Sequence, residues 1–384
     1  MIKKLSSKKR INKVGIVTLY RNNFGSILQA YSTYTFVEKL GYDCTILQLK
    51  YSKRLKDKIV KIPKFLYKCI RYKGYISERR KLSKAVDKEK NLLSKGTKKK
   101  MDDFIEHNFK IKEYQNRNLK TLNDKYDFFI TGSDQVWNGY DKFRYLVFAD
   151  KKKKIALAPS FGGNKIKSYD KKNIRKAIDE FSSLSAREES GVEIIRNLTG
   201  RNALRLPDPT IILNKNEWIE FAKNGIKKTN YILVHFLNQP NDIAIKVINE
   251  YLENHDCKVY CICNQYDVYN KLLRYEFIDV NPYDYVSLIS FADFVFTDSF
   301  HSTLFSINLE IDFLTFDRQH FHGVSQRSRL LDLLNRVSMQ YKFVTEDYEN
   351  IIFEKNKKWS SDLIFREERD NIKNYIKVAL NNDR

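Results

Sequence analysis

The chain has 384 residues, enough for two domains of ordinary size, and its apolar fraction of 42% is typical of a soluble globular protein. No apolar run approaches the roughly 18 residues that a membrane span needs. The basic N-terminus does not continue into the apolar segment of a signal peptide. These features predict a cytoplasmic protein. The formal net charge of +23 indicates an attraction to anions, which include nucleic acid, acidic lipid surfaces, phosphorylated metabolites and acidic glycans, without choosing among them.

The five cysteines are few and odd in number, which fits reduced thiols better than a disulfide framework. Cys257, Cys261 and Cys263 lie close together, but the Cys-x-Cys pattern is that of a single strand. No second cluster of cysteine or histidine accompanies it. We therefore predict no metal site and no cofactor.

Residues 51–100 concentrate the positive charge, with 19 Lys or Arg against 4 Asp or Glu. Apolar residues, among them Ile59, Phe65 and Ile70, are spaced between the lysines. A basic helix with an apolar face would suit an anionic membrane surface and predicts a peripheral location at the inner face of the membrane. The alternative is a solvated helical insertion whose apolar face packs on its own domain.

The N-terminal part begins with a pattern of strand, turn, helix and strand. Residues 14–20 are an apolar run that favours a strand, residues 27–40 predict a helix, and residues 43–49 predict a second strand. Such a βαβ unit predicts a parallel sheet. Gly25, in the turn, is weak as a sign of a phosphate loop because the G-x-G-x-x-G spacing is absent. A tight turn would also explain it.

A polar loop follows the next predicted strand, residues 126–131. In this loop, residues 132–138, small and polar side chains stand beside Trp137, as they would on a surface that binds a sugar. A purely structural loop would explain the same residues. Residues 155–159 predict one more strand.

Arg187 stands between residues 181–186 and a predicted helix that ends at about residue 198. Its guanidinium could bind a carboxylate or a phosphate there. The alternative is an ion pair with Glu188 or Glu189. Residues 204–209, with two prolines, are the best candidate for a domain boundary.

A second α/β series follows. It predicts strands at 231–236, 258–263, 294–296 and 313–316, and helices at 242–253, 282–290, 302–311, 330–337 and 361–379. His301 lies in the turn after residues 294–296, at the edge of a parallel sheet where ligands collect. The N–H groups of the helix start would favour an anion, and a histidine beside it could deliver a proton. The alternative is that Ser299 or Ser302 caps the helix and His301 fills space.

Four motifs occur in order along the chain: Asn23-Phe24-Gly25-Ser26-Ile27-Leu28-Gln29, Gly132-Ser133-Asp134-Gln135-Val136-Trp137-Asn138, Ser185-Ala186-Arg187-Glu188 with Asp208-Pro209-Thr210, and Thr297-Asp298-Ser299-Phe300-His301-Ser302. Ser328-Arg329-Leu330 adds a later basic motif. Together they resemble the polysaccharide pyruvyl transferase family over residues 13–337. Any one motif is weak, and the ordered set is the specific signal. Residues 51–100 are more lysine-rich than this family leads us to expect, and the C-terminal segment carries no family motif.

The resemblance implies an α/β, GT-B-like fold with two Rossmann-like domains facing each other across a cleft. Residues 1–209 would form the N-terminal domain, on the acceptor side, with a basic helical insertion at about 51–110. Residues 210–337 would form the C-terminal domain, on the donor side. Residues 338–384 would be a charged helical tail.

The resemblance also implies an enzyme that transfers pyruvate from phosphoenolpyruvate to hydroxyls of a cell-surface glycan, or of its lipid-linked precursor, and forms a pyruvate ketal. This reaction would serve the synthesis of an exopolysaccharide, a capsule or a cell-wall polysaccharide. It needs a proton on the methylene carbon of the donor, cationic groups for the donor carboxylate and phosphate, and a base for the hydroxyls.

By the same resemblance, Arg187 would clamp the anionic donor and His301 would bind it and act as the acid. Asp298 would orient His301, although it could equally be a turn former. We therefore expect His301, Arg187 and Asp298 to be catalytic. The other donor-binding candidates are Ser299, Ser302 and Arg329, and the acceptor-binding candidates are Asn23, Gly25, Asp134 and Asn138.

Two other functions stay open. A GT-B glycosyltransferase that uses a nucleotide sugar would need the same fold and the same anion site, but no clear acidic ribose ligand follows Tyr231. A non-catalytic protein that binds polyanions or membranes through its basic surface would not need His301. We expect phosphoenolpyruvate and a glycan as partners, and no nucleic acid.

Overall fold

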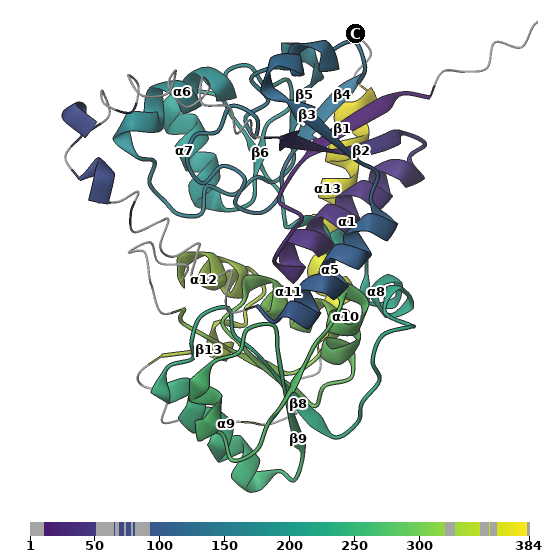
Figure 1. The fold of residues 1–384 in the computed structure, drawn as a ribbon, viewed down its shortest axis with the longest axis vertical. Helices are drawn as coiled ribbons and strands as arrows, with labels where there is room; N and C mark the ends of the chain where they lie inside the picture. The colour runs from purple at the N-terminus through teal and green to yellow at the C-terminus, as the bar shows by residue number, and fades with distance from the viewer. Residues whose placement is uncertain are drawn as a thin grey trace, which may run out of the picture.

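The computed structural model describes residues 11–50, 93–318, 327–345 and 359–381, together with scattered positions between 65 and 80 and Phe353. Figure 1 shows two α/β lobes, one above the other. The upper lobe holds the N-terminal part of the chain, in purple to teal, and the lower lobe holds the later part, in green. Each lobe is built on its own parallel sheet.

The first lobe contains a five-stranded parallel sheet in the order β3-β2-β1-β4-β5. Its strands are β1 (Lys13–Val17), β2 (Asp43–Lys50), β3 (Ile111–Gln115), β4 (Phe128–Thr131) and β5 (Lys154–Ala156). The short strands β6 (Ser185–Ala186) and β7 (Leu204–Arg205) pair with each other beyond β5. The central strands are buried, which is why β1 and β4 are mainly apolar. The strand order is that of a Rossmann-like sheet.

The helices of this lobe are α1 (Phe24–Lys39), α5 (Lys95–Asn108), α6 (Ser168–Ile178) and α7 (Glu189–Thr199). Helix α1 begins before the predicted residue 27 because Asn23 caps it, and Asn23 Oδ1 accepts a hydrogen bond from Ser26 N at 3.2 Å. Helix α5 is capped in the same way, since Ser94 Oγ accepts from Thr97 N at 3.0 Å. The predicted start of α1 is therefore late by about one turn.

The second lobe repeats the plan with six parallel strands in the order β10-β9-β8-β11-β12-β13. The strands are β8 (Tyr231–His235), β9 (Lys258–Ile262), β10 (Glu276–Ile278), β11 (Phe294–Thr297), β12 (Phe313–Phe316) and β13 (Phe343–Val344). The helices are α9 (Asp242–Asn254), α10 (Pro282–Ser290), α11 (Phe300–Leu309) and α12 (Arg327–Arg336). The predicted α/β fold with two facing Rossmann-like units, a GT-B-like arrangement, is confirmed.

Two connections tie the lobes together. After β7 the chain passes through η4 (Pro209–Ile212) and α8 (Lys215–Phe221) into the second lobe. Helix α13 (Ser361–Asn381), yellow in Figure 1, runs back along the first lobe. Glu310 at the end of α11 accepts from Ser361 N at 2.8 Å, and Tyr375 donates to the Ala156 carbonyl of β5 at 2.7 Å. Helix α13, in the segment predicted as a charged tail, therefore packs on both lobes. Its buried apolar residues are spaced between charged ones, so they do not form a continuous apolar run in the sequence.

Short 3-10 turns complete the described part: η1 (Asn116–Asn118), η2 (Lys120–Leu122), η3 (Lys151–Lys153), η5 (Asp267–Lys271) and η6 (Gln340–Lys342). The predicted domain limits stay predictions. Most of the predicted basic insertion at 51–110 lies outside the described residues, and the membrane contact stays a prediction. None of the helices in the described part combines the length and the apolar character that a membrane crossing requires.

Candidate functional site

His301 sits in the first turn of α11, at the carboxyl end of β11. The helix begins at Phe300 and not at the predicted residue 302, because Ser299 occupies the N-cap and its Oγ accepts from Ser302 N at 3.4 Å. Ser299 N in turn donates to Thr297 Oγ1 at 2.9 Å. This turn points His301 out of the second lobe and toward the first, where its side chain is 5% exposed.

Gly25, in the first turn of α1, lies against the His301 ring. A Cβ atom at Gly25 would come within 2.0 Å of His301 Nδ1, far inside any real contact distance. The absence of a side chain at Gly25 therefore lets the imidazole of one lobe approach the backbone of the other. Gly25, an acceptor-binding candidate, thus has an evident packing role.

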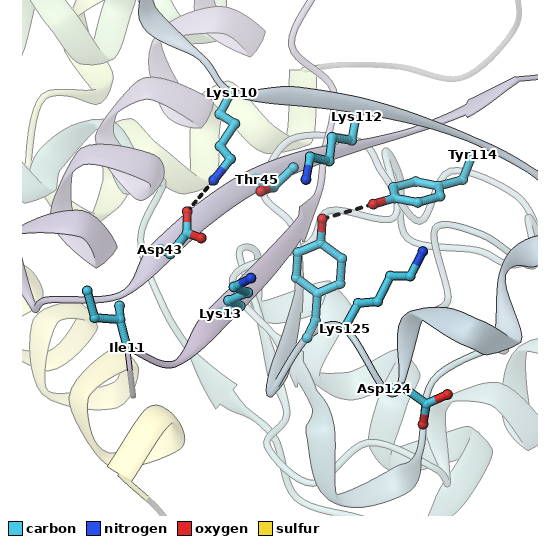
Figure 2. Close-up of a pocket in the computed structure, with 10 residues that line it drawn as sticks. Ile11, Lys13, Asp43, Thr45, Lys110, Lys112, Tyr114, Asp124 and Lys125 are labelled. Atoms are coloured by element: carbon cyan, nitrogen blue, oxygen red, sulfur yellow. Dashed lines mark hydrogen bonds and ion pairs between the residues drawn. The ribbon is translucent and has the colours of Figure 1, made fainter. Parts of the chain in front are cut away.

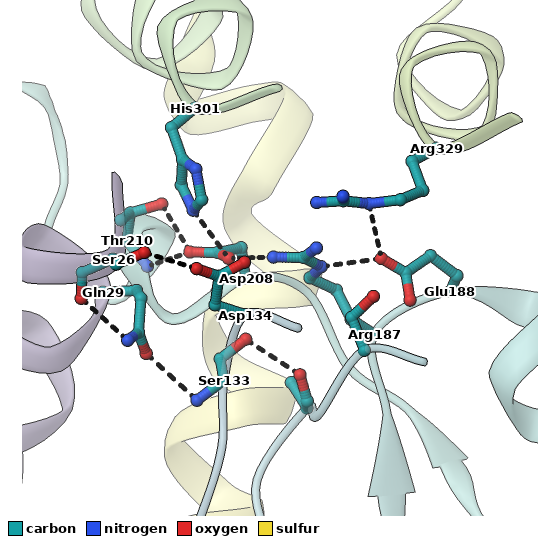
Figure 3. A network of polar contacts seen from close by, with 12 residues as sticks. Ser26, Gln29, Ser133, Asp134, Arg187, Glu188, Asp208, Thr210, His301 and Arg329 are labelled. Carbon is teal, nitrogen blue, oxygen red and sulfur yellow. Dashed lines mark hydrogen bonds and ion pairs between the residues drawn. The ribbon is translucent and has the colours of Figure 1, made fainter. Parts of the chain in front are cut away.

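Asp208, on the connection between the lobes, links His301 to Arg187. Its Oδ2 lies 3.3 Å from His301 Nε2 and accepts from Arg187 Nη1 at 2.8 Å (Figure 3). Its Oδ1 accepts from Thr210 N at 3.1 Å and from Thr210 Oγ1 at 3.0 Å. Burial alone would raise the pKa of Asp208, but His301, Arg187 and Thr210 lower it well below its ordinary value. The carboxylate is therefore ionised, and the two predicted donor residues share one of its oxygens.

Arg187 is 2% exposed and uses two of its nitrogens within the protein. Nε donates to Glu188 Oε1 at 2.8 Å and Nη1 to Asp208, while Nη2 is buried without a hydrogen-bond partner in the described part of the chain. Burial works against its charge, but Glu188, Asp208 and Asp134 raise the pKa of Arg187 above its ordinary value. The ion pair between Arg187 and Glu188, one of the alternatives considered from the sequence, is present. It leaves Nη2 of Arg187 available for an anion.

Arg329 approaches the same place from α12. Its Nε lies 3.4 Å from Glu188 Oε1, and its guanidinium stands 5.3 Å from the centre of the Phe300 ring. The guanidinium of Arg187 lies 4.5 Å from the same ring. Burial and the charge of Arg187 lower the pKa of Arg329 to about 10, so Arg329 stays protonated at neutral pH. The structure thus brings both predicted arginine clamps onto one aromatic ring.

Asp134 faces these cations from the polar loop of the first lobe. Its Oδ2 accepts from Ser26 Oγ at 2.5 Å, and the preceding Ser133 N donates to Gln29 Oε1 at 3.0 Å. Burial favours its neutral form, but the charges of His301, Arg187 and Arg329 lower the pKa of Asp134 below its ordinary value. An ionised carboxylate held by α1 therefore lies in the field of the imidazole and both arginines (Figure 3).

Asp298 makes different contacts. Its two oxygens accept from Leu237 N at 2.6 Å and Asn238 N at 3.0 Å, and Arg318 Nε lies 3.5 Å away. Burial raises the pKa of Asp298 despite these partners. Within the described part of the chain, its hydrogen bonds and ion pairs hold the loop after β8 and do not reach His301.

Ser302 is engaged inside the second lobe. Its Oγ lies 2.6 Å from His235 Nδ1 and 2.8 Å from the Tyr285 hydroxyl. Burial and the nearby charges of Arg318 and His301 lower the pKa of His235 to about 3, so this ring is neutral at physiological pH. Ser302 therefore anchors the start of α11 beneath His301.

The polar loop after β4 does not offer the expected aromatic surface. Trp137 is 1% exposed and stacks on Tyr145, with ring centres 5.0 Å apart. It is part of the core, so the hypothesis of a tryptophan platform for a sugar is wrong. Asn138 is exposed and its Nδ2 donates to Gln135 Oε1 at 3.2 Å.

Two residues of the cluster had no role assigned from the sequence: Asp208 and Phe300. Asp208-Pro209-Thr210 was visible as a motif, and an Asp before Pro marks a turn or helix cap. Nothing in the neighbouring sequence indicated that the Asp208 carboxylate contacts Arg187, 21 positions earlier, and His301, much later in the chain. Among the described residues, no group of three or more His, Cys, Asp or Glu side chains is arranged to hold a metal ion.

Chemically, the cluster combines an imidazole, two buried guanidinium groups and three carboxylates at the junction of the lobes. Its cations can bind a small anion in a medium of low dielectric, where such contacts are strong. Its imidazole and the Asp134 carboxylate can donate and accept protons.

Comparison with solved structures gives only low sequence identity. The S. aureus MnaA–UDP structure is 10% identical with a TM-score of 0.48 and covers 97% of each chain. UDP-GlcNAc 2-epimerase from Neisseria meningitidis is 9% identical with a TM-score of 0.47 and covers 96% of this chain and 94% of its own. UGT89C1 of Arabidopsis thaliana is 10% identical with a TM-score of 0.43, and the match covers 97% of this chain and 94% of its own.

No curated protein sequence matches the chain. The sequence profile described as polysaccharide pyruvyl transferase matches residues 23–320, which is well over half of the chain and includes His301, Arg187, Asp208 and Asp134. The chain therefore belongs to the polysaccharide pyruvyl transferase family.

Proposed function

We propose that the protein transfers pyruvate from phosphoenolpyruvate onto two hydroxyls of one sugar, in a cell-surface glycan or its lipid-linked precursor. The observation that carries this proposal is the meeting of His301 and Arg187 on one oxygen of Asp208, at 3.3 and 2.8 Å. Arg187 Nη2 has no hydrogen-bond partner among the described residues. A proton donor beside an unsatisfied guanidinium nitrogen suits a small donor with two anionic groups.

Arg187 and Arg329 hold the carboxylate and the phosphate of the donor in this proposal. Both lie over Phe300, at 4.5 and 5.3 Å from its ring centre, which fixes two like charges near each other. An incoming anion relieves their mutual repulsion, the same repulsion that helps to lower the pKa of Arg329. The start of α11 adds the positive end of a helix dipole.

The proposed reaction begins when His301 gives a proton to the methylene carbon of phosphoenolpyruvate, which becomes a methyl group. The carbon that bears the phosphate is then electrophilic, and a sugar hydroxyl attacks it while Asp134 accepts the hydroxyl proton. The bond to phosphate breaks, and the second hydroxyl closes the ring as its proton passes to the leaving phosphate. The proton on Asp134 restores His301, so one donor and one diol yield one ketal and one hydrogen phosphate.

The remaining candidates take supporting or open roles. Asp298 and Ser302 position the turn and the helix that carry His301, through Leu237 and His235 respectively. Ser299 caps α11, and the acceptor-side roles of Asn23 and Asn138 stay predictions.

The test is incubation of the purified protein with phosphoenolpyruvate and candidate glycans, with phosphate release and the mass of the ketal product as readouts. We expect both signals in the wild type, loss of both in His301→Ala, and no loss in His107→Ala, an exposed histidine on α5. Phosphate release without a ketal would contradict the proposal. Transfer of a sugar from a nucleotide sugar would favour a glycosyltransferase instead.

A further inference from the structure

A pocket of about 700 Å³ lies on the sheet of the first lobe, at the amino ends of its strands (Figure 2). The candidate site described above lies at the opposite, carboxyl ends of the parallel strands. The pocket is lined by four lysines and two carboxylates together with apolar and hydroxyl-bearing residues: Lys13, Lys110, Lys112, Lys125, Asp43, Asp124, Ile11, Thr45, Tyr114 and Tyr126. Its volume is within the range of pockets that take small ligands, roughly 300–1,000 Å³.

The sheet face that forms this pocket is basic at the amino ends of the strands and apolar toward their carboxyl ends. Because side chains alternate, Lys13 shares a face with Val17, and Thr45 shares it with Leu47. Val17 and Leu47 belong to the apolar core at the carboxyl ends. Parallel sheets are normally covered on both faces. In the part of the chain that the structure describes, Lys13 and Lys112 are exposed, and this open basic end of the face points to a ligand.

Three lysines that line the pocket, Lys13, Lys112 and Lys125, take part in no ion pair within the described part of the chain. Lys110 is paired with Asp43 at 2.6 Å, whereas no ion pair engages the ammonium groups of Lys13 and Lys112. Figure 2 shows them on either side of Thr45, as the strand order β3-β2-β1 requires. Two like charges on one wall favour an anionic ligand between them.

Hydroxyl groups line the same wall. The hydroxyls of Tyr114 and Tyr126 lie 3.1 Å apart. Burial and the contact with Tyr114 raise the pKa of Tyr126, so its hydroxyl stays protonated at neutral pH. Thr45 also lines the pocket, but Thr45 and Tyr126 are 2% and 3% exposed, whereas Tyr114 is half-buried. The Tyr114 hydroxyl can therefore exchange hydrogen bonds with a ligand that itself carries hydroxyls.

We propose that this pocket binds a saccharide that carries a carboxylate. Lys13 and Lys112 hold the acidic group, and the Tyr114 hydroxyl, with Tyr126 behind it, holds the sugar. The inference rests on the proposed function and deepens it, because a pyruvate ketal adds a carboxylate to the glycan. The pocket would bind an acidic unit of the glycan away from the reaction centre.

The test is calorimetric titration of the full-length protein, without phosphoenolpyruvate, with three probes. They are a tetrasaccharide containing glucuronic acid, the same tetrasaccharide with its carboxylates reduced to alcohols, and inorganic phosphate. We expect the acidic tetrasaccharide to bind and the reduced form to bind at least about tenfold more weakly, since each charge-assisted contact is worth about that factor. Added salt weakens the acidic interaction.

The double variant Lys13→Gln/Lys112→Gln assigns the binding to this pocket. We expect it to bind the acidic tetrasaccharide at least about tenfold more weakly than the wild type. The matched control, Lys142→Gln/Lys227→Gln, removes the same charge from exposed positions that do not line the pocket, and it keeps the affinity. Thermal unfolding verifies that both double variants are folded.

Three results would overturn the proposal: equal binding of the acidic and the reduced tetrasaccharide, unchanged affinity in Lys13→Gln/Lys112→Gln, or inorganic phosphate binding as tightly as the acidic tetrasaccharide. The outcome is separate from that of the ketal assay. Binding without ketal formation supports the pocket and rejects the proposed function. Ketal formation without binding does the reverse.

Discussion

At the scale of single residues, Asp208 is the centre of the candidate site. One of its oxygens meets His301 at 3.3 Å and Arg187 at 2.8 Å, and Thr210 holds the other oxygen. Glu188 plays a similar part for Arg187 and Arg329. Because buried cations need partners of opposite charge, these carboxylates hold the reactive groups in place before any donor arrives.

The contact of Gly25 with His301 leads to a first prediction. In Gly25→Ala the new Cβ would overlap His301 Nδ1, so we expect a loss of about 1–3 kcal/mol of unfolding free energy and a loss of ketal formation. The double variant Gly25→Ala/His301→Ala removes the overlapping ring. Urea unfolding should show that it regains part of the stability, while activity stays lost. Equal costs of Gly25→Ala with and without the histidine would contradict this contact.

A second prediction concerns pH. Burial would raise the pKa of Asp208, but His301 and Arg187 lower it below the value of about 3.9 expected in the unfolded chain. A carboxylate with a lowered folded-state pKa adds stability that is present above the unfolded pKa and lost as the pH falls through the folded pKa. Urea unfolding should therefore become easier below about pH 4, and Asp208→Asn should weaken this dependence.

Asp298→Asn is the control for the pH prediction, because burial raises the pKa of Asp298 and its contribution has the opposite sign. Stability from such a group is present below the unfolded pKa and declines as the pH rises through the folded pKa. Asp298→Asn should therefore not weaken the acid dependence. Superimposable acid profiles of the wild type and Asp208→Asn would show that the carboxylate is not ionised in the way described.

At the scale of elements, the sequence was sufficient for the strands and helices with strong apolar patterns. It failed where side chains outside the pattern set the boundary, as at the caps Asn23 and Ser299. It also missed β3, because an edge strand that is only half buried keeps polar residues on its open side. The turn that carries His301 was predicted, but its contact with Gly25 and Asp208 joins distant parts of the chain and leaves no local pattern.

Helix α13 gives a third prediction. Ile372 is fully buried in an apolar cluster that contains residues of both lobes, whereas Val378 on the same helix is 63% exposed. We expect Ile372→Ala to cost about 2–5 kcal/mol of unfolding free energy, since it leaves a cavity in the core. Val378→Ala should cost less than about 0.5 kcal/mol. Equal shifts of the urea midpoint in the two variants would show that α13 does not hold the lobes as the structure indicates.

At the scale of the whole molecule, the two Rossmann-like sheets, η4 and α13 place a histidine of one lobe beside an arginine of the other. Neither lobe contains the complete cluster. The proposed donor therefore depends on both lobes at once, and a change at their junction affects binding and chemistry together. The fold class and the choice of His301 and Arg187 as candidates followed from the sequence, whereas the carboxylates that join them depend on how the lobes pack. That the two residues bind the donor stays a prediction.

The most direct test of the central claim is calorimetric titration of phosphoenolpyruvate into the wild type, Arg187→Gln and His301→Gln, with His107→Gln as a control at an exposed histidine of α5. We predict binding in the wild type and in His107→Gln, and at least about tenfold weaker binding in the other two variants. Thermal unfolding checks that each variant is folded. Unchanged affinity in folded Arg187→Gln and His301→Gln, or binding of a nucleotide sugar in place of phosphoenolpyruvate, would contradict the account.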